Sequence, residues 1–166
     1  MITIIPRGRA GGFTAYLPQE DAKFMTKRQM QHKLISLLGG RAAEEVVLDD
    51  ISTGASNDIE RATKIAHAMV TKYGMSKRLG PMMYGGDDSE VFLGEELGKN
   101  KQYSDKIAYE IDSEMRELID EAYNKALNIL NENIDLLHAL ANRLLEKETI
   151  GQEEFEAIFD TVSYTH

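Results

Sequence analysis

The segment ISTGASNDIERATKIAHAMVTKY, residues 51–73, carries the clearest structural signal of this chain, because turn-forming residues lead directly into an amphipathic helix. Asn57 and Glu60 match a capping box, so we expect the helix to begin near Asp58. At about 100° per residue, its side chains divide into an apolar and a polar face. The apolar face comprises Ala62, Ile65, Ala66, Met69, Val70 and Tyr73, with Ile59 at its edge. The polar face comprises Glu60, Arg61, Lys64, His67 and Thr71.

Asp58 projects with the apolar face, at the first turn of this expected helix. One interpretation is that its carboxylate complements the positive end of the helix dipole. The other is a ligand or an acid/base group directed into a site, because a buried charge without a partner is costly. His67 cannot be that partner within the helix, since it lies about 180° around the axis from Asp58. The partner of Asp58 has to come from elsewhere.

A second capping box precedes an earlier helix, where Thr26 is followed by Gln29. The buried face expected for this helix comprises Met30, Leu34, Leu37 and Leu38. If the helix continues through Gly39 and Gly40, we expect these glycines to let another backbone approach closely.

Three charged residues, Arg41, Glu44 and Glu45, fall on the same face as these leucines. Polar groups on a core-facing stripe need partners. They form an internal network, or they mark a frayed helix end, or they support a functional site from behind.

The N-terminal residues predict a β-hairpin, because two apolar runs, residues 2–5 and 13–17, flank the glycine-containing sequence PRGRAGG. A phosphate-binding loop is the weaker interpretation, since the glycines match neither GxGxxG nor the P-loop pattern and no helix start follows directly. A hairpin leaves an edge strand, which is either covered by the rest of the domain or able to receive an extended peptide. The candidate residues for such strand addition are Phe13, Thr14, Ala15 and Tyr16.

The second half of the chain changes from loop to helix. Residues 74–101 are rich in glycine and predict mostly loop with one or two short strands, as a mobile lid or a subunit-contact segment. Ser104 then caps a long helix, and a second helix follows a break at residues 131–133, so we expect an antiparallel pair. Residues around 155–159 form a short closing helix, and residues 163–166 are expected to fray. The core positions of the long helix are Ile107, Ile111, Met115, Leu118, Ala122, Ala126 and Ile129. Those of the second helix are Ile134, Leu137, Leu140, Ala141, Leu144 and Leu145.

The predicted fold is therefore mainly α, a helical domain with a small N-terminal β-hairpin or sheet and a C-terminal antiparallel helix pair. We expect one domain over residues 1–166, with a catalytic-side part at 1–103 and a C-terminal helical part at 104–162. The net charge of −9 argues against nucleic acid as a partner. Without cysteine, the chain has no disulfide and no thiolate metal ligand. It lacks an apolar run long enough to span a membrane and the residue order of a signal peptide, so by itself it is expected to be soluble.

Local motifs identify no complete catalytic site. There is no His-Glu-x-x-His, no Gly-x-Ser-x-Gly, no P-loop and no pair of Glu-x-x-His units. The histidines His32, His67 and His138 are all expected on polar helix surfaces.

A resemblance provides what the motifs do not. Its evidence is a series of sequence blocks: TIIPRGRA (3–10), LP (17–18), LGGRAAEE (38–45), STGASND (52–58), YGMS (73–76), LGP (79–81), VFLG (91–94) and YSD (103–105). Through these blocks nearly the whole chain, in order, closely resembles the peptidase domain of the FtsH-type ATP-dependent zinc metalloproteases. The blocks at 38–45 and 52–58 are long and specific.

The resemblance implies that Asp58 is the third ligand of a catalytic Zn²⁺ and that Glu44 lies near the metal without binding it. In the family, the other two ligands and the catalytic glutamate belong to a His-Glu-x-x-His helix that precedes the segment matched here, and these residues are absent from this sequence. The chain alone is therefore expected to be inactive, because one carboxylate cannot hold catalytic zinc.

The complete enzyme would degrade unfolded or membrane proteins as a hexamer on the cytoplasmic side of a membrane, with ATP used by another domain. The competing hypothesis is a non-catalytic helical assembly module or a pseudo-protease.

Overall fold

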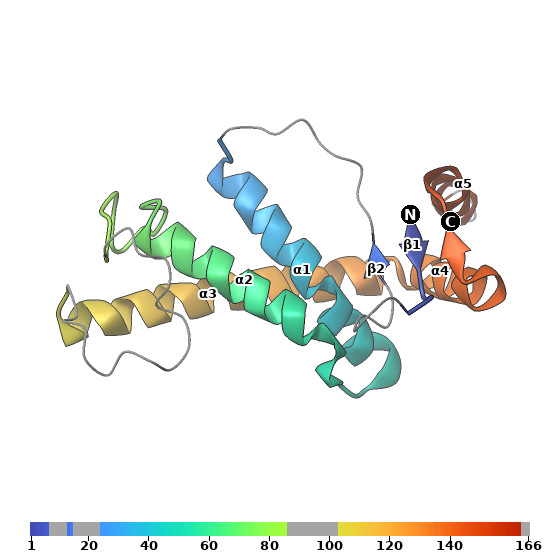
Figure 1. Cartoon of the computed structure of the whole chain (residues 1–166), viewed down its shortest axis with the longest axis horizontal. Coiled ribbons are helices and arrows are strands. Elements are labelled where there is room, and N and C mark those ends of the chain that lie inside the picture. Colours follow the sequence, from blue (N-terminus) through green and yellow to red (C-terminus); the bar gives the residue numbers. More distant parts are fainter. Residues whose placement is uncertain (7–12, 15–23, 86–102, 164–166) are drawn as a thin grey trace. The chain divides into compact units, whose positions relative to one another are not determined.

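The structure is a computed structural model, and it describes residues 1–6, 13–14, 24–85 and 103–163. These residues form five α-helices, one 3₁₀ helix and three two-residue strands, which confirms the predicted mainly α class with a small sheet (Figure 1). The chain divides into two compact units. Unit 1 combines Met1–Phe24 with Ile129–His166, and unit 2 is Met25–Asn128. The expected functional division at residue 103 stays a prediction.

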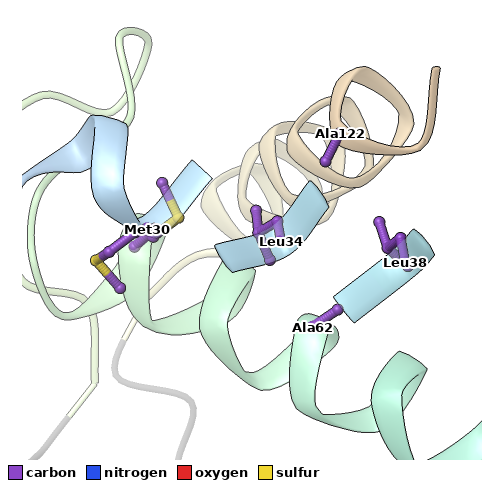
Figure 2. Close-up of a cluster of buried hydrophobic side chains, with 6 residues drawn as sticks. Met30, Leu34, Leu38, Ala62 and Ala122 are labelled. Carbon is purple, nitrogen blue, oxygen red and sulfur yellow. The ribbon is translucent and has the colours of Figure 1, made fainter. Parts of the chain in front are cut away.

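The core of unit 2 is built from α1 (Lys27–Leu48), α2 (Ser56–Thr71) and most of α3 (Asp105–Glu132). The capping box at the start of α1 is confirmed, with both hydrogen bonds between Thr26 and Gln29 present. Figure 2 shows Leu34 and Leu38 of α1 packed with the small side chains of Ala62 from α2 and Ala122 from α3. Burying the leucine side chains contributes about 1.5–3 kcal/mol each, so this contact stabilises the unit.

The glycines of α1 have a different role from the predicted one. The helix continues through Gly39 and Gly40 to Leu48, but apart from its own backbone no atom of the described residues lies within 4 Å of the position where either Cβ would stand. The prediction that another backbone approaches these glycines closely is therefore wrong for the described residues. Because α1 is regular to Leu48, the idea that its end frays at the charged residues was also wrong.

The start of α2 differs from the prediction. A 3₁₀ helix, η1 (Thr53–Ala55), runs directly into α2, which begins at Ser56 rather than near Asp58. Ala55 occupies the N-cap position and makes no side-chain capping bond, so the capping box predicted from Asn57 and Glu60 was wrong. The apolar face of α2 is confirmed for its alanines, Met69 and Val70, all buried, whereas Tyr73 remains 52% exposed and Thr71 is buried.

Unit 1 contains a three-stranded antiparallel sheet in the order β2-β1-β3. Its strands are β1 (Ile2–Thr3), β2 (Phe13–Thr14) and β3 (Thr149–Ile150). The pairing of Ile2 with Thr14 confirms the hairpin, and β2 lies at the sheet edge. The third strand was not predicted. It pairs Ile2 with the fully buried Ile150, and the hydroxyls of Thr3 and Thr149 lie 2.8 Å apart.

The C-terminal helices of unit 1 are α4 (Ile134–Lys147) and α5 (Gln152–Ser163). The break before α4 and the closing helix are confirmed. The C-terminal helices in contact are α4 and α5, one helix later than the pair expected, and β3 and Gly151 lie between them in the sequence. Nε of Arg143 lies 2.5 Å from a Glu154 oxygen, and Lys147 Nζ lies 3.0 Å from the same oxygen. Three core predictions fail, since Ile129, Ala141 and Leu145 are exposed.

Several predictions lie outside the described residues: Ala15 and Tyr16, the loop after residue 85 and the last three residues. In the part of the loop that is described, residues 74–85, the chain forms turns and no strand. Across the described ranges, none of the helices combines the length and the apolar character required to cross a membrane.

Candidate metal-ligand site

The residue that leads into α2, Ser52, is held by two residues of α1. Arg41 Nη1 donates a hydrogen bond to the Ser52 carbonyl oxygen at 3.1 Å. The two carboxylate oxygens of Glu44 accept bonds from the Ser52 amide at 3.1 Å and from its hydroxyl at 2.5 Å. We call this arrangement of Arg41, Glu44 and Ser52 the Ser52 clip. It uses the amide, the carbonyl and the hydroxyl of a single residue.

A series of hydrogen bonds connects Ser52 to the first turn of α2. The Ser52 hydroxyl oxygen accepts the Gly54 amide at 3.1 Å, which caps η1. A Cβ on Gly54 would stand 3.2 Å from that hydroxyl oxygen and 3.7 Å from Glu44, so the glycine allows a close approach here. The Ser56 amide then donates to Thr53, and Ala55 is buried. The start of α2 is thus fixed by the preceding turn.

Asp58 stands in this first turn, on the side that one turn later carries the buried Ala62. Its side chain is 48% exposed, so the expectation of an inward-facing carboxylate was right for the helix face and wrong for burial. The described part of the core covers Ala62 but leaves the first turn accessible. Arg61 Nη1 lies 3.8 Å from Asp58 Oδ1, a distance too long for a hydrogen bond. The helix dipole interpretation and the ligand interpretation are both compatible with this position.

The clip carries a negative charge that the fold stabilises. The bonds from the Ser52 hydroxyl and amide, assisted by the charge of Arg41, hold the pKa of Glu44 below its ordinary value. Glu45 follows on α1 and accepts a hydrogen bond from the Tyr123 hydroxyl of α3. Burial, followed by the contact with Glu45, raises the pKa of Tyr123. The three charged residues of α1 therefore form a network that ties α1 to the turn before α2 and to α3.

The described residues can supply part of a zinc site. Within residues 1–6, 13–14, 24–85 and 103–163, no group of three His, Cys, Asp or Glu side chains is placed to hold a metal ion. Asp58 fits one leg of such a site, because it is an accessible carboxylate on a fixed helical turn. Glu44 is already engaged through both oxygens.

Sequence reasoning missed the role of Ser52 in this region, whereas Arg41 and Glu44 were expected to need partners on this face of α1. The signal available for Ser52 was a serine two residues before a glycine, a pattern typical of a local side-chain turn. His67 was also misjudged. It is a half-buried residue of α2, where burial lowers its pKa and the charge of Asp112 on α3 acts in the opposite direction. His32 and His138 are exposed as expected.

Comparison with known proteins connects this geometry to a family. The sequence matches the description "Peptidase family M41" over residues 1–158. It is 57% identical over 159 residues to an ATP-dependent zinc metalloprotease FtsH 1 of a Thermoanaerobacter species, covering 96% of this chain and 26% of the relative. The ATP-dependent zinc metalloprotease FtsH of Caldicellulosiruptor bescii is 55% identical, with 95% and 26% covered. The protein of the same name from Bacillus subtilis is 48% identical, with 96% and 25% covered.

The chain thus spans about a quarter of the length of these curated relatives. The segment with the Ser52 clip and Asp58 lies inside the matched region. The match extends over nearly the whole chain, and this chain therefore belongs to peptidase family M41.

Proposed function

We propose that this chain forms part of the peptidase domain of an ATP-dependent zinc metalloendopeptidase, with Asp58 as the third zinc ligand. The position of Asp58 carries the proposal: it is a half-exposed carboxylate on the first turn of a helix whose start is held by the Ser52 clip. Catalytic zinc takes three protein ligands and leaves one position for water. When bound, the ion would supply Lewis-acid activation of water and of a peptide carbonyl.

The surroundings of Asp58 support this role. Arg61 is more than half exposed and makes no hydrogen bond to Asp58 at 3.8 Å, so the carboxylate oxygens stay available to a cation. The carboxylate sits on a rigid helix rather than on a loop, as a precise ligand requires. Glu44 would stay near the ion without binding it, because it bonds Ser52.

The sheet edge is the second part of the proposal. Strand β2 pairs with β1 on one side and ends the sheet order, so an extended polypeptide substrate could add to it as a further strand. We propose Phe13 and Thr14, continuing through Ala15 and Tyr16, as this substrate strand. Backbone hydrogen bonds would bind many sequences, which suits an enzyme that acts on unfolded or membrane proteins.

The properties of the whole protein are part of the same proposal. Two relatives are named ATP-dependent zinc metalloprotease FtsH, and a third FtsH 1. By this relationship, an ATPase domain would deliver substrate, the assembly would be a hexamer, and it would act at the cytoplasmic side of a membrane. The 166 residues contain no His-Glu-x-x-His, so we propose that they do not hydrolyse peptides by themselves.

The experiment joins this chain to the upstream portion of the Thermoanaerobacter relative. Zinc content and casein hydrolysis are measured for the purified protein and for Asp58→Ala. The matched control is Asp105→Ala, which removes an acidic residue from the first turn of α3 instead. We expect about one zinc per chain and ATP-dependent hydrolysis in the parent and the control, and loss of both in Asp58→Ala. Zinc binding that is indifferent to Asp58→Ala would remove Asp58 from the site.

The 166-residue chain is assayed beside it. Zinc bound at one equivalent, or casein cleavage, by this chain alone would contradict the proposed inactivity. If the joined protein binds no zinc although it assembles, the chain is instead a non-catalytic assembly module or a pseudo-protease.

A further inference from the structure

The Ser52 clip lies directly before a helix that has no side-chain cap of its own. Helix α2 has alanine at its N-cap and no side-chain capping bond of its own. The nearest side chain that caps the turn is Ser52, four residues before Ser56, where α2 begins. Two residues on one face of α1 hold this serine by its amide, carbonyl and hydroxyl groups. The geometry of the start of α2 is therefore set from α1.

We propose that Arg41, Glu44 and Ser52 are positioning residues, which fix the direction of the Asp58 carboxylate by holding the 3₁₀ turn that leads into α2. The inference rests on the proposed function, since it needs Asp58 to be a ligand. It gives Glu44 a role that differs from contact with the ion. Glu44 acts through Ser52 and η1, and Arg41 fixes the carbonyl that the carboxylate cannot bind.

The path from Glu44 to Asp58 is short and continuous. Glu44 Oε1 accepts the Ser52 hydroxyl, and the same hydroxyl oxygen accepts the Gly54 amide. The Thr53 carbonyl oxygen then accepts a hydrogen bond from the amide of Ser56, and Ser56 is the first residue of α2. Asp58 follows two residues later, so a rotation of the 3₁₀ turn would turn its carboxylate as well. Buried Ala55 in the middle of this path resists the turn's collapse.

The first measurement uses the 166-residue chain and does not depend on metal. Amide hydrogen exchange is compared for Ser52→Ala, Ser52→Thr and Ser104→Ala. Ser104 is the matched control, because its hydroxyl caps α3 through the Ile107 amide. We expect Ser52→Ala to raise exchange at Gly54 and Ser56 by about tenfold, since local opening becomes easier. Ser52→Thr keeps the hydroxyl and restores protection, and Ser104→Ala affects Ile107 instead.

The second measurement uses the chain joined to the upstream portion of the Thermoanaerobacter relative, with zinc affinity determined by competition with a chelator. We expect Ser52→Ala and Glu44→Gln to weaken zinc by about tenfold, in the range found when a partner of a metal ligand is removed. Ser52→Thr restores the affinity and Ser104→Ala leaves it unchanged. If Ser52 only stabilised the fold, Ser52→Ala and Ser104→Ala would have the same effect on zinc affinity.

The outcomes separate this inference from the proposed function. If Asp58→Ala leaves zinc affinity unchanged, the proposed function fails. If Asp58→Ala abolishes binding but Ser52→Ala changes neither zinc affinity nor exchange at Ser56, the positioning role is overturned. The same holds if Ser52→Ala opens the turn while zinc affinity stays at the parent value, because the direction of Asp58 would then not depend on the clip.

Discussion

Nε of Arg78 lies 3.1 Å from Oε1 of Glu114, a residue of α3 that keeps only 9% of its surface exposed. The other oxygen of Glu114 accepts the Ser76 hydroxyl at 2.5 Å, and the Ser76 hydroxyl oxygen accepts the Leu79 amide at 3.0 Å. Arg78 also reaches Glu117 at 3.0 Å. A single buried carboxylate thereby attaches the turn after α2 to α3.

Replacing Glu114 with alanine is expected to destabilise unit 2 by about 2–3 kcal/mol, because the buried Ser76 hydroxyl loses its acceptor. Arg78→Ala is expected to cost about 1 kcal/mol, since Arg78 is half exposed and its pairs are screened by water. The free energy of unfolding is measured from hydrogen exchange of α3 amides. Lys64→Ala, which removes an exposed pair with Glu60 at 2.6 Å, is the control and should change it by less than about 0.5 kcal/mol. Equal effects of Glu114→Ala and Lys64→Ala would contradict this assignment.

Gly74 is required by its conformation and by its neighbour. Its φ is +61°, and a Cβ there would stand 2.8 Å from the Cα of Pro81. Gly80 has a similar φ of +69°, but no atom of the described part of the chain lies within 4 Å of its Cβ position. Gly80→Ala should therefore cost about 1–2 kcal/mol for the left-handed conformation alone. Gly74→Ala should cost clearly more, because backbone atoms must also move. Thermal unfolding of both variants tests the difference, and equal losses would show that Pro81 yields without cost.

Gly39 offers a change in the opposite direction. It lies inside α1, and a Cβ there would meet no atom of the described residues within 4 Å apart from the helix's own backbone. Gly39→Ala is expected to raise the free energy of unfolding by about 0.5–1 kcal/mol, since alanine loses less backbone entropy in a helix. The measurement is urea unfolding followed by circular dichroism. A loss of stability would contradict the entropy argument for this position.

The helices could be predicted because their periodicity is local. Met30, Leu34 and Leu38 repeat at helical spacing and are buried together, and the Thr26 capping box forms as expected. The same motif failed for Asn57, because η1 extends the helical path backwards and places Asn57 inside α2. Two similar capping-box patterns thus have different outcomes, because a 3₁₀ helix precedes only the second one.

The remaining features depend on contacts between distant residues. Strand β3 has two residues and pairs with β1 across nearly the full length of the chain, so no local alternation indicates it. At the candidate site, the helix wheel placed Asp58 on the correct face, and only the family resemblance suggested a metal. The bonds from Glu44 to Ser52 require the tertiary approach of α1 to the turn, which helix periodicity does not contain.

His67 should respond to pH in a direction set by its burial. Burial lowers its pKa in the folded chain, and the Asp112 charge on α3 offsets only part of this decrease. Unfolded histidine titrates near about 6.5. Between that value and the lower folded pKa, the unfolded chain binds more protons, so folding stability is complete above about pH 6.5 and falls as the pH decreases through this window. Denaturation at a series of pH values measures the slope.

Asp112→Asn isolates the partner of His67. Removing the negative charge should lower the pKa of His67 further and widen the pH window in which stability falls. The pKa is followed by NMR of the imidazole protons. Asp120→Asn is the matched control, because Asp120 lies two turns further along α3, about 12 Å away, and its charge is screened at physiological ionic strength. The Thr71 hydroxyl, 3.4 Å from His67 Nδ1, is present in both variants. A pKa that rises in Asp112→Asn would mean that the carboxylate does not face the ring, whereas equal shifts in both variants would assign the effect to the overall charge of α3.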